Sequence, residues 1–165
     1  MKKKVVIIVV TIIILFGIIT GIILLNKKNI TYGKNAFYLE DELYDVSSNY
    51  EDISLAKLNN LISNKKSFVI FTYASFCPFQ IPSDQIFKTV FKNNNMKLYA
   101  IGYDKLKGTE IINEVEYAPS VVIFKEGKIV AHLDANSDED YNRYQDTKEF
   151  QDWLSNYVYL TKKEK

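Results

Sequence analysis

An uncharged apolar run near the start of the chain constrains its fold more than any other feature. Residues 5–25 read VVIIVVTIIILFGIITGIILL and contain no charged side chain. At about 1.5 Å of rise per residue, a helix of this length spans roughly 30 Å, the thickness of the hydrocarbon core of a bilayer. A buried helix of a globular domain would keep one polar face, which this run lacks. We therefore expect a single N-terminal transmembrane helix.

The residues around this run favour an uncleaved anchor over a signal peptide. A signal peptide would have an apolar region of only about 7–15 residues, followed by a small-x-small cleavage site. This run is longer and ends in LLNKKN, without such a site. Lysines at 2–4 and the α-amino group outweigh the lysines at 27–28, and the positive-inside rule then places the N-terminus in the cytoplasm. We expect a single-pass protein of the cell membrane with an extracytoplasmic domain.

Charge and cysteine content limit what that domain can be. Five of the 21 basic residues flank the apolar run, which leaves 16 against 20 acidic residues and a net charge of −4. A nucleic-acid-binding domain would carry a basic patch, so we expect no nucleic-acid partner. The only cysteine is Cys77, so no disulfide can form within the chain. In an oxidising compartment such a cysteine is either buried and inert or exposed and reactive.

Hydrophobic periodicity predicts an alternation of strands and helices. We divide the chain into the anchor (1–28), a tether with a possible first strand (29–49) and a folded domain (50–165). The expected elements are a strand in 36–44, a helix in 50–64 capped by Asp52 or Ser54, a doubly buried strand in 65–73, a helix in 83–93, a strand in 96–104, a short helix in 107–116, a hairpin in 118–134 with its turn at 125–128, and a helix in 147–160. This order predicts a mixed sheet with helices on both faces.

Two segments resemble the thioredoxin superfamily. FVIFTYASFCPFQ, residues 68–80, is similar to the family's buried strand leading into an aromatic-Cys-x-x-Cys turn. YAPSVVIFKEGKIV, residues 117–130, is similar to the family's cis-proline segment followed by a strand, a glycine turn and a strand. The element order from about residue 50 to 159 agrees with both. The resemblance implies a thioredoxin-like three-layer α/β/α fold with a mixed central sheet, preceded here by the transmembrane helix.

The same segments supply the expected site residues. Cys77 is expected at the N-terminal end of the second helix, where the helix dipole favours the thiolate, the nucleophile of disulfide exchange. Pro78 suits the first turn of a helix, and Phe76 is an aromatic beside the thiol that is suited to contact a partner. The resemblance implies that Pro119 is the cis-proline beside the cysteine and that Ala118 offers its backbone to an extended peptide.

Three departures from the family pattern weaken the expected chemistry. Gln80 stands where the family has its second, resolving cysteine, although its amide is suited to bond the thiolate or a docked peptide. Phe71 stands where many members carry a buried acid. Pro82 falls within the first turns of the expected helix, which it would bend unless the helix begins anew at Ser83 or Asp84.

Residues 134–146 alternate acidic and polar side chains as a calcium-binding loop does. The position that needs glycine is Glu139, and the position that needs a bidentate glutamate is Gln145. We therefore expect a solvated loop, no metal site and no cofactor. The only histidine, His132, falls on the last expected strand, away from Cys77, so we expect no Cys–His nucleophile pair.

These observations leave two functions open. The preferred one is single-cysteine thiol–disulfide exchange, of isomerase or thiol-capture type, on a protein partner that carries a thiol or disulfide in an extended segment. The alternative is a non-enzymatic interaction module with an inert cysteine, in a membrane or export assembly of the bacteriocin or conjugation type.

Overall fold

A computed structural model of the chain describes residues 30–74 and 82–164. The chain divides into two units, 1–30 and 31–165, and all described residues except Ile30 belong to the second. The expected transmembrane helix, 5–25, lies outside the described residues. Among the residues that are described, no helix is both long enough and apolar enough to cross a bilayer.

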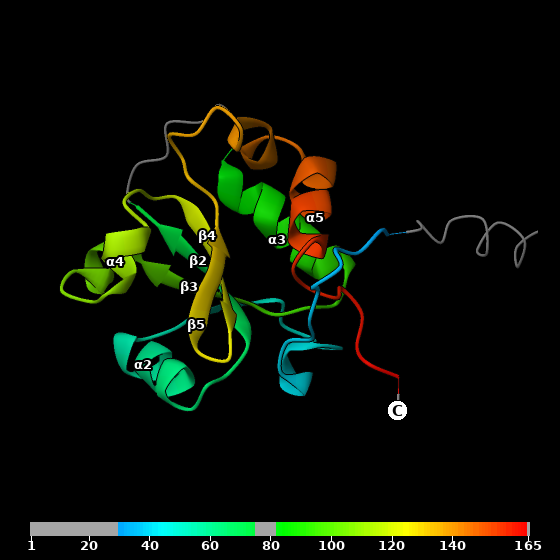
Figure 1. The fold of residues 1–165 in the computed structure, drawn as a ribbon, viewed down its shortest axis with the longest axis horizontal. Coiled ribbons are helices and arrows are strands. Elements are labelled where there is room, and N and C mark those ends of the chain that lie inside the picture. The colour runs from blue at the N-terminus through cyan, green and yellow to red at the C-terminus, as the bar shows by residue number, and fades with distance from the viewer. Residues whose placement is uncertain (1–29, 75–81, 165) are drawn as a thin grey trace, which may run out of the picture. The chain divides into compact units, whose positions relative to one another are not determined.

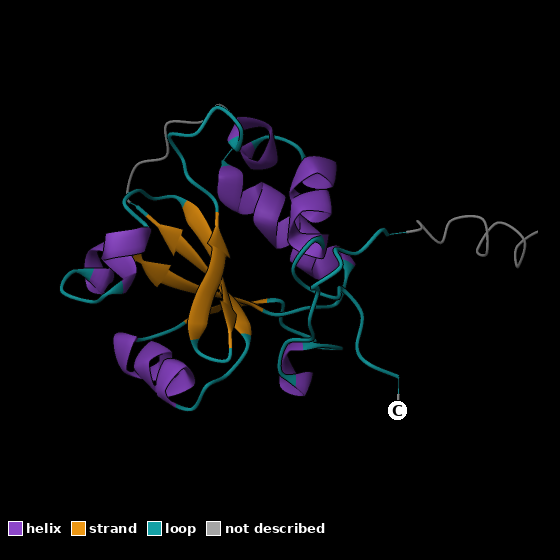
Figure 2. Ribbon diagram, in the orientation of Figure 1, coloured by secondary structure: helices purple, strands orange, loops and turns teal. Residues whose placement is uncertain are grey.

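The centre of the domain is a mixed five-stranded sheet (Figures 1 and 2). Its strands are β1 (Tyr50–Asp52), β2 (Phe68–Tyr73), β3 (Leu98–Gly102), β4 (Ser120–Lys125) and β5 (Lys128–His132). They lie in the order β1-β3-β2-β4-β5, with β1, β3 and β2 parallel and β4 antiparallel to both β2 and β5. This sheet fits the thioredoxin-like α/β fold that the sequence predicts.

Helices cover both faces of the sheet and complete three layers (Figure 2). On one side lie α2 (Leu55–Ser63) and α4 (Ile111–Glu114), and on the other lie α3 (Ser83–Asn93) and α5 (Thr147–Ser155). Short 3-10 helices occur at η1 (Asp41–Leu43), η2 (Tyr103–Leu106) and η3 (Tyr141–Tyr144). Helices α3 and α5 bury their apolar sides against the sheet and against each other.

Aromatic rings fill the layer between the sheet and α3 and α5. Phe87 is fully buried at its centre, with its ring centroid 5.5 Å from Phe71, 4.6 Å from Phe150 and 5.6 Å from Tyr144. Such pairs contribute about 0.5–1.5 kcal/mol each beyond the burial of their area. Because no disulfide is possible, this packing has to hold the helices on the sheet.

Local signals set several element ends where the sequence predicts them. Ser54 caps α2, since its hydroxyl accepts from the amide of Lys57 over 3.2 Å. The hairpin turns at Glu126 and Gly127, whose φ angles of 50° and 76° both lie in the left-handed region, as a two-residue type I′ turn requires. Strand β2 is buried on both faces from Phe68 to Thr72.

The first strand is not where the sequence predicts it. Residues 36–44 contain η1 and two isolated bridges in place of a strand. The strand is instead β1, Tyr50–Asp52, within the segment predicted as helix, and it pairs in parallel with 98–100 of β3. The sequence of β1 does not alternate apolar and polar residues, so it gives no signal for a strand. As an edge strand, β1 depends on pairing with its neighbour for its extended conformation.

The last helix is shorter than predicted. Helix α5 ends at Ser155, although the periodicity continues to 160. The carbonyl of Ser155 accepts from the amide of Gly33 over 3.1 Å, and Val158 forms a parallel bridge with Phe37. The chain after Ser155 therefore leaves the helical conformation, because it pairs with residues that lie far away in the sequence.

Candidate functional site

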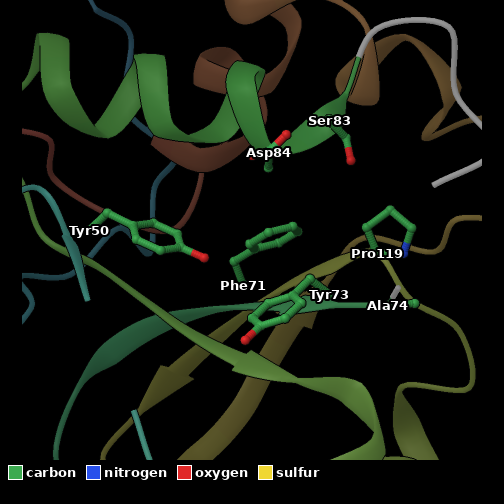
Figure 3. Close-up of a pocket in the computed structure, with 7 residues that line it drawn as sticks. All are labelled: Tyr50, Phe71, Tyr73, Ala74, Ser83, Asp84 and Pro119. Carbon is green, nitrogen blue, oxygen red and sulfur yellow. The ribbon is translucent and has the colours of Figure 1, made fainter. Parts of the chain in front are cut away.

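A pocket of about 220 Å³ lies at the C-terminal end of β2 (Figure 3). The described residues that line it are Tyr50, Phe71, Tyr73, Ala74, Ser83, Asp84 and Pro119. They come from edge strand β1, from β2 and the residue after it, from the first turn of α3 and from the residue before β4. The pocket thus joins the two segments on which the sequence prediction rests.

Pro119 lies at the wall of this pocket, and the peptide bond between Ala118 and Pro119 is cis. The prediction of a cis bond there is confirmed. Pro119 is buried, and its backbone carbonyl oxygen accepts a 2.9 Å hydrogen bond from the hydroxyl of Tyr144. The next residue, Ser120, pairs with Thr72 in the sheet. Both contacts hold Pro119 beside the end of β2.

Phe71 lies at the back of the pocket, where many members of the resembled family carry an acid. Its side chain is only 3% exposed, and its ring packs edge-on against Phe87. Figure 3 shows the ring between the side chains of Tyr73 and Asp84. At this position the pocket offers an aromatic surface and no proton acceptor.

Polar groups ring the mouth of the pocket in two bonded pairs. The hydroxyl of Tyr73 donates to a carboxylate oxygen of Asp52 over 3.0 Å. The ammonium of Lys88 donates to Asp84 over 2.9 Å and also lies 4.1 Å from the ring centroid of Tyr50. The charge of Asp84 is therefore balanced within the first turns of α3.

The surroundings of the pocket raise the pKa of both Tyr50 and Tyr73 above that of an ordinary tyrosine. Burial first, and then the charge of Asp52, raises the pKa of Tyr50 to about 12. Tyr73 and Asp84 act on Tyr50 in the same direction. The hydrogen bond to Asp52 is the main cause that raises the pKa of Tyr73. At neutral pH both phenols are protonated, so they present hydroxyl groups to a ligand.

The helix that follows the cysteine segment begins at Ser83, with Pro82 as its N-cap. The prediction that a helix begins anew at Ser83 is confirmed, and Pro82 lies outside α3, not within its turns. The amide of Gln85 donates to the carbonyl of Pro82 over 2.9 Å, which closes the first turn. The predicted residues Phe76, Cys77, Pro78 and Gln80 lie in 75–81, outside the described residues.

The sequence did not predict that the side chains of Asp84 and Tyr50 line the site. Asp84 lies in the first turn of the helix after Cys77, a position that could have suggested it. Tyr50 belongs to edge strand β1, and no sequence signal points from it to the site. Tyr73, the last residue of β2, is half-buried and also lines the pocket.

The remaining candidates are separate from the pocket. His132 is the last residue of β5 and does not line it. In the suspected calcium loop, the carboxylate of Asp140 accepts from the amide of Asp134 over 2.7 Å and pairs with Arg143. Within 30–74 and 82–164, no group of three His, Cys, Asp or Glu side chains is placed to hold a metal ion.

Comparisons with known proteins give similarities among solved structures. No protein-family model and no curated protein matches the sequence. A cysteine-to-serine mutant of Entamoeba histolytica thioredoxin is 21% identical over 58% of this chain and 96% of its own, with a TM-score of 0.42. Trxlp from Edwardsiella tarda and oxidised thioredoxin from Plasmodium falciparum are 14% and 13% identical, each over 64% of this chain and 98% of its own, both with a TM-score of 0.47. These similarities concern the fold, and no activity follows from them.

Proposed function

We propose that this chain is a membrane-anchored, extracytoplasmic thioredoxin-like protein that performs thiol–disulfide exchange through one cysteine. The observation that carries the proposal is the lining of the pocket at the end of β2. Ala74 and Ser83 both line it, and the segment that joins them contains the only cysteine. Pro119, the counterpart of the family's cis-proline, lines the same pocket.

Chain connectivity supports a thiol near this pocket. Three peptide units link Ala74 to Cys77, and consecutive Cα atoms are about 3.8 Å apart. Cys77 is thus close to Ala74 in the sequence, which supports the proposal that its thiol serves this pocket. No other sulfhydryl group exists in the chain to compete for the role.

The proposed reaction exchanges one disulfide for another. The thiolate of Cys77 attacks one sulfur of a partner disulfide, a new sulfur–sulfur bond forms, and the other partner sulfur leaves as a thiolate that takes up a proton. Electrons are conserved, so no oxidant or reductant is needed. Because Gln80 replaces the resolving cysteine, release requires a thiolate from the partner or from a small thiol. Attack by the partner's own thiolate isomerises its disulfides.

The partner segment is proposed to lie extended along Ala118. Among the described residues, neither backbone group of Ala118 has a hydrogen-bond partner. An extended peptide can therefore pair with it in the manner of an added strand. The hydroxyls of Tyr50 and Tyr73 at the pocket mouth are placed to receive polar groups of such a segment.

The alternative function is an interaction module that has kept the fold and lost the chemistry. The aromatic ring of Phe71 in place of an acid favours it, since the pocket then lacks a buried proton acceptor. This alternative predicts a slowly reacting Cys77 with the pKa of an ordinary thiol, about 8.5.

Alkylation of the full chain in nanodiscs separates the two functions. The rate of iodoacetamide reaction with Cys77, followed by mass spectrometry against pH, reports the thiol pKa. Exchange predicts a half-maximal rate well below pH 8.5, with Cys77→Ser as the unlabelled control. A half-maximal rate at or above that pH would favour the interaction module.

The variant Gln80→Cys provides a second test. It restores a resolving cysteine, so it should gain insulin reduction in the presence of a recycling reductant, whereas the natural chain should show almost none. If Gln80→Cys reacts no faster than the natural chain, the segment does not hold its thiol in an exchange-competent site.

A further inference from the structure

The first residues of the domain are bound tightly to its C-terminal segment. The hydroxyl of Ser155 donates to the carbonyl of Thr31 over 3.0 Å, and the amide of Gly33 donates to the carbonyl of Ser155. The amide of Phe37 donates to the carbonyl of Tyr157 over 2.9 Å. A Cβ at Gly33 would lie 2.2 Å from the carbonyl oxygen of Asn156, so only glycine allows this approach. The chain is therefore fixed on the domain from Thr31 onward, within the predicted tether.

Three tyrosines gather where this segment is fixed. The ring of Tyr159 lies 4.9 Å from that of Tyr32 and stacks on that of Tyr38 at 4.4 Å. Tyr38 is 37% exposed, and the ammonium of Lys163 lies 6.0 Å from its ring centroid. We call this surface the tyrosine face; it consists of Tyr32, Tyr38 and Tyr159 with the exposed lysines Lys34, Lys162 and Lys163.

The tyrosine face and the pocket lie at opposite ends of the sheet. The amide of Glu40 donates to the carbonyl of Ser67, the residue just before β2, over 3.1 Å. The pocket lies at the other end of β2, beyond Tyr73. Six strand residues at about 3.3 Å each separate the two ends by roughly 20 Å.

We propose that the tyrosine face rests on the headgroup region of the bilayer, so that the pocket points away from the membrane. This inference rests on the anchor in the proposed function. Only six residue steps of sequence separate Leu25, the end of the apolar run, from Thr31, the first residue of the fixed segment. So short a connection would keep the N-terminal end of the domain near the bilayer, and the side chains on that end would then decide which face meets the lipids.

The chemistry of the tyrosine face suits this location. Tyrosine has an apolar ring and a polar tip, and it is enriched where hydrocarbon meets headgroups. Lysine side chains beside it can extend to lipid phosphates. Asp41 and Glu42 are exposed on η1 nearby and reduce the positive charge of this end. Aromatic contact, more than charge, therefore accounts for the attachment.

The consequence concerns which partners can reach the site. A partner disulfide within a few ångströms of the lipid surface would lie near the tyrosine face, at the end of the domain opposite the pocket. The partner segment must extend well beyond the headgroups or belong to a soluble protein.

Fluorescence quenching in vesicles tests this orientation on the full chain. Cys77→Ser removes the natural thiol, and Asn35→Cys or Lys107→Cys then provides a single attachment point for a fluorophore. Asn35 is exposed beside the tyrosine face, and Lys107 is exposed after η2, at the pocket end of the sheet. The vesicles contain phosphatidylcholine and phosphatidylglycerol with a spin label on the headgroup, which quenches nearby fluorophores.

We expect several-fold stronger quenching at position 35 than at 107, and a marked loss at 35 when Tyr38→Ser or Lys163→Glu is added. Equal quenching at the two positions overturns the orientation, and so does quenching at 35 that neither added substitution changes. Flotation of the chain with the vesicles reports the anchor separately. A chain that does not float overturns the anchor and this inference together. Because the thiol is absent throughout, no result here bears on the exchange reaction.

Discussion

The hydroxyl of Tyr144 donates a 2.9 Å hydrogen bond to the carbonyl oxygen of Pro119. Tyr144 is fully buried and ends η3, the short turn before α5. Its ring also packs on Phe87, so one side chain joins the wall of the pocket to the aromatic layer beneath α3. The position of Pro119 is thus tied to the core as well as to the sheet.

The first prediction follows from this bond. Tyr144→Phe keeps the ring and removes the hydroxyl, which leaves the buried carbonyl of Pro119 without that donor. We expect the free energy of unfolding in urea to fall by about 1–2 kcal/mol. Tyr117 is 46% exposed, so Tyr117→Phe is the matched control and should change stability by less than about 0.5 kcal/mol. Equal effects of the two substitutions would contradict the structural role of the bond.

The second prediction concerns the acid that this pocket lacks. Phe71→Asp restores the carboxyl of the resembled family but removes a buried ring and places a polar group against Phe87. We expect a loss of more than about 3 kcal/mol in the free energy of unfolding. Phe71→Leu keeps an apolar side chain and should cost about 1.5 kcal/mol or less. An aspartate variant as stable as the natural chain would mean that the pocket can accommodate a charge.

Much of the architecture could be predicted because local signals agree with the fold. The apolar segment that became β2 is buried on both faces, Ser54 caps α2, and Glu126 and Gly127 turn the hairpin. The cis bond before Pro119 was predicted from the family resemblance of its segment. Each of these features depends on residues within a few positions of one another.

The features that escaped prediction depend on contacts between distant parts of the chain. Strand β1 acquires its conformation from β3, although Glu51 and Asp52 have no strand-like pattern. Helix α5 stops early because Gly33 and Phe37 pair with the residues after it. Tyr50 reaches the pocket through β1, so its place there could not be inferred until the strand order was known.

A third prediction uses pH. The pKa of Tyr50 is about 12 in the folded chain and about 10 in an unfolded one. Between these values the unfolded chain loses the proton while the folded chain keeps it. The stability linked to this group is therefore intact below pH 10 and is lost as pH rises toward 12. Urea unfolding across this range should fall less steeply with pH for Tyr50→Phe than for the natural chain. If stability falls equally steeply with pH in Tyr50→Phe and in the natural chain, the raised pKa of Tyr50 is contradicted.

The hairpin turn supplies a fourth prediction. Gly127 has a φ of 76°, and a Cβ there would lie 2.4 Å from the carbonyl oxygen of Ile62. Gly108 has a φ of 83°, but a Cβ there would meet no atom within 4 Å. Gly108→Ala should therefore cost only the backbone penalty, about 1 kcal/mol, and Gly127→Ala about 2 kcal/mol or more. Thermal unfolding of both variants measures the difference, and an equal loss would exclude the predicted clash.

The central claim is that Cys77 captures a partner disulfide and cannot release it alone. Mass spectrometry of the full chain in nanodiscs tests it most directly, after incubation with a peptide whose single cysteine forms a disulfide with 2-thiopyridine, a leaving group that does not attack the new disulfide. We predict one peptide per chain joined to Cys77, stable until a small thiol is added, and no adduct on Cys77→Ser. Absence of an adduct on the natural chain, or its release without added thiol, would contradict the claim.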